Sequence, residues 1–170
     1  YFTGVRVSEL LSIRTKDFDF INKTIKIFGK GKKERFIPLA EILAKRIQIF
    51  VQQFNITGYL FTNEKNKRLY SRKIYRIVKD HLSMYSTKTN NSPHILRHTF
   101  ATHMLDNGAD INAIKEILGH SSLNATQVYT HNSIKKIKSI YKKAHPRAWY
   151  FFYKKNVKYD ESKQNFNKFA

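Results

Sequence analysis

The spacing of apolar residues changes twice in the first third of the chain. Helical spacing over residues 5–13 predicts a short helix that ends near Thr15. Between residues 17 and 38 the apolar residues recur two apart, in runs separated by the segments 21–23 and 29–33. These alternating positions are Phe18, Phe20, Ile25, Ile27 and Phe36. The alternation predicts a small antiparallel sheet of three strands joined by two tight turns.

Helical spacing then returns and dominates the rest of the chain. It predicts helices over residues 39–55 and 71–82, with one more short strand at Leu60 and Phe61 between them. Ser92 can accept a hydrogen bond from a free backbone N–H and Pro93 suits the first helical position, so a helix is predicted from there to Gly108. Further helices are predicted over 110–119, with Asp110 as N-cap and Gly119 as its end, over 122–129, and over 133–143.

These elements predict a mainly α fold with a small three-stranded antiparallel β-sheet, an α+β class. The 170 residues are enough for one domain of ordinary size, and 41% apolar residues can form one core. After Pro146 comes the aromatic run 149–153, followed by charged and polar residues to Ala170. We therefore expect a domain over residues 1–148 and a tail over 149–170.

The chain is strongly basic. Its 32 Lys and Arg against 12 Asp and Glu give a formal charge of +20 and a pI near 10.1. Such a molecule repels itself unless a polyanion is close, which makes nucleic acid the first partner to consider. Part of the excess reflects a composition rich in Lys, Asn and Ile, so the charge is a hint and not a proof.

Several classes of protein are excluded by what the sequence lacks. Without cysteine there are no disulfides, cysteine zinc sites, iron–sulfur clusters or thiol nucleophiles, and a cytoplasmic location is expected. No run of eighteen apolar residues and no signal pattern is present, so no membrane partner is expected. Because the chain begins at Tyr1 and not at Met, we expect a fragment truncated at its N-terminus.

The segment His94-Ile95-Leu96-Arg97-His98 places two His and one Arg within one turn of a predicted helix start, where an anion is favoured. Two His at this spacing could also bind zinc. The metalloprotease pattern, however, requires Glu directly after the first His, and Ile95 stands there, so no metal is expected. Taken alone, the segment also has a structural interpretation, with both His capping or hydrogen bonded in a core.

Other residues along the chain favour chemistry on a phosphodiester. The set is Arg6, Lys30, His94, Arg97, His120 and Tyr129. Two guanidinium forks can bind the oxygens of a phosphate under attack, and a Tyr hydroxyl, with its pKa near 10, needs a proton acceptor such as a His before it attacks. A Lys on the 29–33 turn could protonate the leaving oxygen. Each residue also has an ordinary interpretation, as a surface ion-pair partner, a solvated turn or a core aromatic.

The local sequence around these residues resembles that of the tyrosine site-specific recombinases, in the Xer and phage-integrase-like group. The similar segments are Val5–Leu11, Gly29–Leu39, His94–His103, Leu118–Ser121, Tyr129–His131 and Lys143–Ala148. They occur in the order of that family and cover residues 1–148. The resemblance implies the fold of a recombinase catalytic domain.

The resemblance also implies a role for each candidate residue. Arg6, Arg97 and His120 would bind the scissile phosphate, and Tyr129 would be the nucleophile that forms a 3′-phosphotyrosyl link. Lys30, between the two turn glycines, would be the general acid, with Lys32 and Lys33 as the alternatives. His94 would accept the proton of the tyrosine. No metal, ATP or other cofactor would be needed.

By the same resemblance the partner would be a double-stranded DNA recombination site, with a tetramer acting on two such sites. The helix over 133–143 has an apolar stripe, which we expect to dock onto a neighbouring subunit, with packing on its own domain as the alternative. Two other functions stay open: a DNA-binding protein of the same fold that does not cleave, and a type IB topoisomerase. Glu9 either orients the helix that carries Arg6 or faces solvent.

Overall fold

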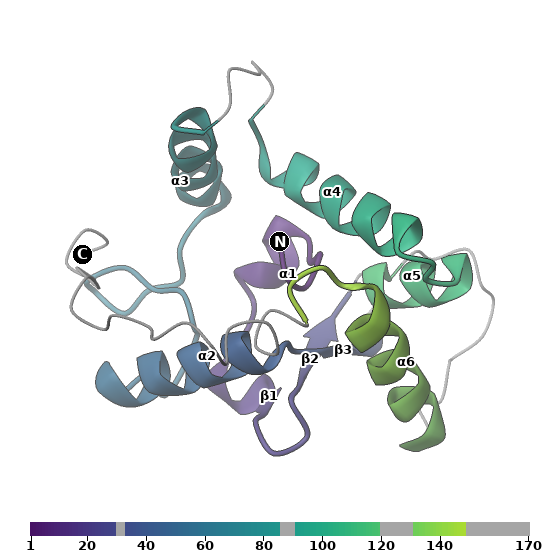
Figure 1. Cartoon of the computed structure of the whole chain (residues 1–170). Coiled ribbons are helices and arrows are strands. Elements are labelled where there is room, and N and C mark those ends of the chain that lie inside the picture. The colour runs from purple at the N-terminus through teal and green to yellow at the C-terminus, as the bar shows by residue number, and fades with distance from the viewer. Residues whose placement is uncertain (30–32, 86–90, 120–130, 149–170) are drawn as a thin grey trace, which may run out of the picture.

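The computed structural model describes residues 1–29, 33–85, 91–119 and 131–148. The described residues form six α-helices, one 3₁₀ helix and three strands (Figure 1). In chain order these are α1 (Val7–Leu10), η1 (Thr15–Asp17), β1 (Phe18–Asp19), β2 (Thr24–Phe28), β3 (Glu34–Pro38), α2 (Glu41–Gln53), α3 (Ser71–Ser83), α4 (Pro93–Asp106), α5 (Ile111–Leu118) and α6 (His131–Ala144). Helices α4, α5 and α6 pack on one another, and α5 and α6 also contact β3. The predicted class, mainly α with a small three-stranded antiparallel sheet, is confirmed.

The sheet has the strand order β1-β2-β3, and both pairs are antiparallel. Ile25 of β2 lies between Phe18 of β1 and Ile37 of β3, and Ile25 and Ile37 are both buried. The register also pairs Ile27 with Arg35, so that a charged side chain takes an inward position of β3. The sequence pattern selected Phe36 as the apolar position of this strand, whereas the strand buries its neighbours on either side.

The ends of α5 follow the prediction closely. The Asp110 carboxylate accepts hydrogen bonds from the backbone N–H groups of Asn112 (2.9 Å) and Ala113 (3.1 Å), as an N-cap does. Gly119 ends the helix with a φ of 68°, in the left-handed region that favours glycine. One end is set by a local side-chain bond and the other by the backbone freedom of glycine, which is why the sequence predicted both.

At the start of α4 the prediction was correct in place but wrong in mechanism. Pro93 is the first helical residue, yet within the described residues the Ser92 hydroxyl makes no capping bond. The Ser92 carbonyl instead accepts a hydrogen bond from the N–H of Ile95 at 3.1 Å, which closes a tight first turn. Helices α2, α3 and α6 confirm the predictions for residues 39–55, 71–82 and 133–143.

Two predicted elements differ from the structure. The helix expected over residues 5–13 is the single turn α1, followed by the 3₁₀ turn η1. Leu60 and Phe61 do not form a strand: Leu60 donates one backbone bond to Ile13, and the nearby pairing is limited to isolated bridges such as Arg14 with Tyr59. Leu60 is buried in the core although its segment forms no continuous ladder. The helix predicted over 122–129 and the aromatic run 149–153 lie outside the described residues.

The core lies where α4, α5 and α6 meet the sheet. Phe100 and Met104 of α4 and Ile117 of α5 are almost completely inaccessible to solvent. The N-terminal segment passes directly over this core, since a Cβ atom built on Gly4 would lie 2.6 Å from the ring of Phe100. Gly4 has a φ of 59°, so its backbone conformation also favours glycine. The backbone just before Arg6 is therefore fixed against α4.

Helix α6 packs on its own domain in this single chain, which is the alternative given above, and docking onto a neighbouring subunit stays a prediction. Ile137 and Tyr141 are buried, and the Tyr141 hydroxyl donates to the carbonyl of Phe2 at 3.0 Å. Contacts with α4, α5 and β3 use the apolar stripe that the prediction left for a partner.

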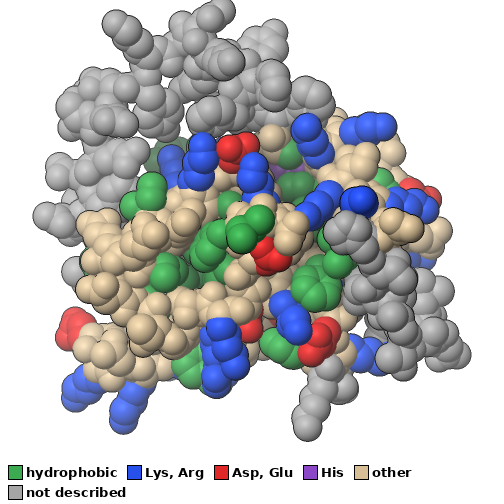
Figure 2. Space-filling view, turned by 90° about the horizontal axis from the view of Figure 1, so that it is seen from below, with side chains coloured by type: hydrophobic (Ala, Val, Ile, Leu, Met, Phe, Trp, Pro, Cys, Tyr) green, Lys and Arg blue, Asp and Glu red, His purple; other side chains and the backbone are tan. Residues whose placement is uncertain are grey.

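The surface carries basic side chains in several places. In Figure 2, Lys and Arg side chains project from many parts of one face, with Asp and Glu side chains between some of them. The basic charge of this face is therefore spread out and not gathered in one patch. No helix within the described ranges is both long enough and apolar enough to cross a membrane.

Candidate active site

Arg6 lies at the N-terminal end of α1 and is oriented by Glu9. The backbone N–H of Arg6 donates to Oε2 of Glu9 at 2.8 Å, and its Nη1 donates to Oε1 of the same carboxylate at 3.0 Å. Glu9 is buried, with 6% of its surface exposed, whereas the Arg6 side chain is 40% exposed. Glu9 thus orients Arg6, one of the two roles expected for it, and leaves the guanidinium partly open to solvent.

Arg97 reaches the same region from α4. Its Nη1 donates to the carbonyl of Gly4 at 2.6 Å and its Nη2 to the carbonyl of Leu118 at 2.7 Å. Burial, together with the positive charge of Arg6, lowers the pKa of Arg97 to about 10. The side chain is still a cation at neutral pH, and part of its hydration has already been replaced by backbone carbonyls.

The two arginines meet at the C-terminal end of α5. Arg6 donates from Nη1 to the Leu118 carbonyl at 3.5 Å and from Nη2 to the Gly119 carbonyl at 3.3 Å, so both guanidinium groups share Leu118. The last carbonyls of a helix lack intrahelical donors and carry partial negative charge, which attracts cations. Two residues far apart in sequence are in this way held side by side.

The pair can still bind an anion. A guanidinium has five N–H donors, and contacts within the described part of the chain use three of those on Arg6 and two on Arg97. The remaining donors suit the oxygens of a phosphate, which arginine forks bind in two-point geometry.

A third arginine, Arg35 of β3, completes the cluster and was not among the predicted site residues. Its Nη1 and Nη2 donate to the two oxygens of Glu9 at 2.9 Å and 2.8 Å, and its Nε donates to the carbonyl of Ile117 at 2.7 Å. Burial by itself would raise the pKa of Glu9, but the hydrogen bonds from Arg35 and Arg6 and their positive charges outweigh it and hold the pKa below its ordinary value. The signal in the sequence was a charged residue at an inward register of a strand.

His94 does not join this cluster. It is exposed on the first turn of α4, and its ring centroid lies 6.3 Å from that of Tyr75 on α3. Lys30, His120 and Tyr129 lie outside the described residues. The structure thus brings together two of the six candidates, Arg6 and Arg97, and leaves the roles of all six as predictions.

The glycines next to two of those candidates are described, and both border the Arg35–Glu9 pair. A Cβ built on Gly29 would lie 3.7 Å from Nη1 of Arg35 and 3.9 Å from Oε1 of Glu9. One built on Gly119 would lie 2.9 Å from the same Nη1. The backbone at both glycines therefore lies close to the same Arg35–Glu9 ion pair.

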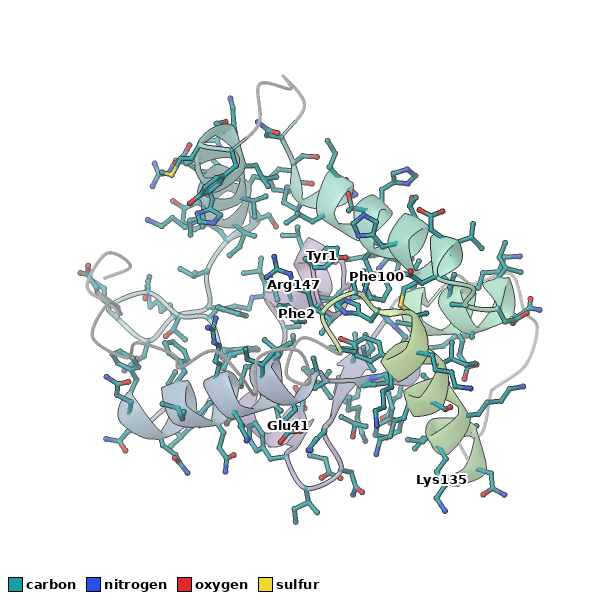
Figure 3. All side chains as sticks on the ribbon, viewed as in Figure 1. Tyr1, Phe2, Glu41, Phe100, Lys135 and Arg147 are labelled. Carbon is teal, nitrogen blue, oxygen red and sulfur yellow. The ribbon has the colours of Figure 1, made fainter. Side chains whose placement is uncertain are left out.

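His145 was also missed by the sequence analysis. It is buried at the end of α6 among aromatic rings, with Tyr141 stacked on it at 4.7 Å and Phe2 at 5.6 Å. Figure 3 shows Tyr1, Phe2, Phe100 and Arg147 close together in this view, and the rings of Tyr1 and Phe100 lie 5.3 and 5.5 Å from that of His145. Burial, helped by the positive N-terminus and Arg147, lowers the pKa of His145 to about 4, so it is neutral at pH 7 and serves as a packing residue.

No cluster of three or more His, Asp or Glu side chains suited to a metal ion occurs among the described residues. The chemistry that the described part of the site supports is anion binding by two half-buried guanidinium groups. Both groups are held on backbone carbonyls, and Arg6 also shares the Glu9 carboxylate with a third arginine, Arg35.

Comparison with known proteins points to one family. Residues 1–136 match the phage integrase family. Tyrosine recombinase XerD of Staphylococcus saprophyticus is 39% identical over 155 residues, and tyrosine recombinase XerC of Pelobacter propionicus is 42% identical over 151 residues. Each alignment covers 87% of this chain, but 52% of that XerD and 50% of that XerC, so the chain spans about half the length of these relatives.

A solved structure shares the fold. The XerH site-specific recombinase, bound to its difH substrate in a pre-cleavage complex, superposes with a TM-score of 0.65 at 29% identity. The match covers 83% of this chain and 44% of that one. The arrangement of helices around a three-stranded sheet is that of a tyrosine recombinase catalytic domain, as the sequence predicted.

Proposed function

Since the chain belongs to the phage integrase family, we propose that residues 1–148 are the catalytic domain of a site-specific DNA recombinase that cleaves and rejoins strands through a 3′-phosphotyrosyl intermediate. One observation carries the proposal more than any other. Arg6 from α1 and Arg97 from α4 both donate to the carbonyl of Leu118, which sets two guanidinium groups side by side with N–H donors to spare.

The reaction needs this pair because a phosphodiester under attack gathers negative charge on its non-bridging oxygens. Arg6 and Arg97 bind those oxygens, and their charge is worth most where water is partly excluded. His120 adds a hydrogen bond to the same phosphate. Because both guanidinium groups are positioned before DNA arrives, little reorganisation is needed during the reaction.

The covalent step is an exchange of one ester for another. The Tyr129 oxygen forms a bond to phosphorus while the bond to the 5′-oxygen of the DNA breaks. His94 accepts the proton of Tyr129, and Lys30 donates a proton to the leaving 5′-oxygen. Attack by a 5′-hydroxyl on the phosphotyrosine reverses the step and rejoins a strand, so neither ATP nor a metal ion enters the balance.

The DNA partner is a double-stranded recombination site, and the assembly is a tetramer on two such sites. The formal charge of +20 supports a polyanionic partner, and the related XerH is bound to its DNA substrate. Most contacts of a catalytic domain with DNA are expected to be to phosphate, which fixes the position of the protein on the duplex.

The decisive experiment is to trap the covalent complex on nicked candidate sites, with Tyr129→Phe as the test variant and Tyr70→Phe, an exposed tyrosine, as the control. Tyr129→Phe removes only the nucleophilic oxygen, so we expect loss of the adduct with DNA binding nearly unchanged. A wild-type chain that binds DNA without an adduct would instead be a non-cleaving protein of this fold. Adducts without preference for sequence would indicate a type IB topoisomerase.

The role of Lys30 has its own test. Sulfur at the 5′-bridging position leaves without needing a proton, so Lys30→Ala should be slow on normal DNA and close to wild type on the sulfur substrate. Equal impairment on both substrates would move the general acid to Lys32 or Lys33.

A further inference from the structure

We propose that Arg35 is a positioning residue of this site: together with Glu9, it fixes the end of α5 so that Arg6 and Arg97 are correctly placed for the scissile phosphate. The inference rests on the proposed function and deepens it. Arg35 touches no substrate in this scheme, and it acts through the groups that do.

The Arg35 side chain is buried and held by hydrogen bonds at all three of its nitrogens. It is only 4% exposed, and three N–H donors from three different nitrogens have partners between 2.7 and 2.9 Å. Two of these donors form a two-point bond to Glu9, which the planar fork of arginine can make and the single ammonium of lysine cannot. A buried charge held in this way has one orientation.

The last carbonyl groups of α5 accept hydrogen bonds from the three arginines in a fixed order. Ile117 accepts from Arg35, and Leu118 accepts from both Arg97 and Arg6. Arg35 binds the innermost of these carbonyls and is the most deeply buried of the three arginines. The Leu118 carbonyl, one residue further on, is thereby held in place for Arg6 and Arg97, which remain partly exposed to solvent.

The carboxylate of Glu9 is shared between two cations, Arg6 and Arg35. Its Oε1 accepts from both Arg6 and Arg35. Without Arg35, the carboxylate keeps Arg6 as its remaining cationic partner in the described part of the chain, and the net charge of this group of side chains falls by one positive charge. We expect Glu9 then to draw Arg6 inward and to disfavour a phosphate nearby. Arg35 so protects the charge of the anion site.

The backbone of two neighbouring segments approaches the Arg35 guanidinium closely. Gly29 and Gly119, the residues just before Lys30 and His120, both lie against the Arg35 guanidinium. The contact with Gly119 leaves no room for a side chain, because a Cβ there would lie 2.9 Å from Nη1. A change in the position of Arg35 would therefore act directly on the backbone at Gly119, the residue just before His120.

The test is single-turnover cleavage of a suicide DNA site by the full 170-residue chain, with DNA affinity and melting temperature measured in parallel. Arg35→Lys should lower the cleavage rate about 100-fold, the loss that a small misplacement of reacting groups causes, while DNA affinity stays within about threefold. Lysine keeps the positive charge but lacks the planar guanidinium that makes the two-point bond to Glu9, so this conservative variant should not restore the cleavage rate. Arg46→Lys, on the exposed side of α2, is the matched control and should cleave like wild type.

A stability control separates positioning from folding. Leu60→Val removes one methylene from the core at a buried residue whose backbone N–H bonds to Ile13, and we expect it to lower the melting temperature without lowering the cleavage rate of the folded fraction. Should Leu60→Val slow cleavage as much as Arg35→Lys at an equal loss of melting temperature, the role of Arg35 is merely structural and the inference is overturned.

A double-mutant cycle tests the route of action. If Arg35 acts through Arg6, the loss from Arg35→Lys should largely disappear in an Arg6→Ala background. Independent, multiplicative losses would overturn the inference while leaving the proposed function intact. A wild-type chain that forms no adduct at all would overturn the proposed function, and this inference with it.

Discussion

Two groups of arginines in this molecule show how differently the same side chain can be held. The inner cluster, Arg6, Arg35 and Arg97, is at least half-buried and bound to backbone carbonyls and to Glu9. In the outer cluster, the exposed side chains of Arg14 and Arg68 lie over the ring of Tyr59, with 4.7 and 5.8 Å from their Cζ atoms to the ring centroid. The inner arginines have fixed directions, whereas the outer ones are held mainly by one aromatic ring.

The comparison teaches which arginine positions can support chemistry. Stabilising a transition state requires donors that are already oriented, and carbonyl partners provide that orientation. General attraction to DNA requires only charge near the surface. We therefore expect the inner cluster to control cleavage and the outer cluster to affect affinity alone.

The largest effect should come from Arg97. Arg97→Ala removes an oriented donor and should lower the rate of adduct formation about a hundred- to a thousandfold, with little change in DNA affinity. Single-turnover cleavage measures the loss, with Arg68→Ala as the control from the outer cluster. Comparable losses for both variants would erase the distinction between the clusters.

The next effect concerns stability. Glu9→Gln leaves the buried Arg35 guanidinium without its counter-charge, which should lower the free energy of unfolding by about 3–5 kcal/mol, as removal of one partner of a buried ion pair does. Denaturant unfolding gives this value. Asp17→Asn, beside exposed Arg14, should unfold like wild type.

The sign of the pH dependence follows from the same carboxylate. The pKa of Glu9 is lowered in the folded state, so its contribution is present above the ordinary Glu pKa and is lost as the pH falls through the lower folded value. The wild-type melting temperature should fall in that acid range more steeply than that of Glu9→Gln. Parallel curves would show that Glu9 does not carry the acid sensitivity.

A smaller effect should mark the outer cluster. If Arg14 and Arg68 each contact one DNA phosphate, replacing both with Ala should reduce the slope of log affinity against log salt by about 1.8, since each contact contributes about 0.9. Cleavage of DNA that is already bound should be unchanged. An unaltered slope would remove these residues from the DNA interface.

The smallest effect is spectroscopic. The hydrogen bond from Arg14, at 3.1 Å, lowers the pKa of the Tyr59 hydroxyl. Arg14→Ala should therefore shift one tyrosine to a higher pH in an ultraviolet titration of the chain. No change in the titration would mean that Arg14 is not held on Tyr59 in solution.

Sequence reasoning succeeded where structure is decided locally. Asp110 and Gly119 set the ends of α5 by themselves, and the alternation of Ile25 and Ile27 determined the sheet. It failed where a tertiary contact decides. Leu60 is buried in the core without belonging to a strand, and at Ser92 it is the carbonyl, not the hydroxyl, that accepts a bond in the first turn of α4.

The site divides in the same way. Residue chemistry and family resemblance both pointed to Arg6 and Arg97 as candidates, but no spacing could show that both would bind Leu118, because the contact depends on how α1, α4 and α5 pack. Arg35 was overlooked because the inward positions of a strand are predicted from apolar residues, and Arg35 is charged. A buried charge there becomes understandable only once Glu9 is found opposite it.

The close packing of Gly4 on Phe100 has a consequence for how this domain can vary. A glycine with positive φ and no space for a Cβ tolerates no replacement, although it takes no part in the chemistry. Its carbonyl also holds Arg97, and two residues later the chain presents Arg6. In a mutational scan this glycine should be as intolerant as a catalytic residue, so intolerance in this segment would map the support of the active site as well as the active site itself.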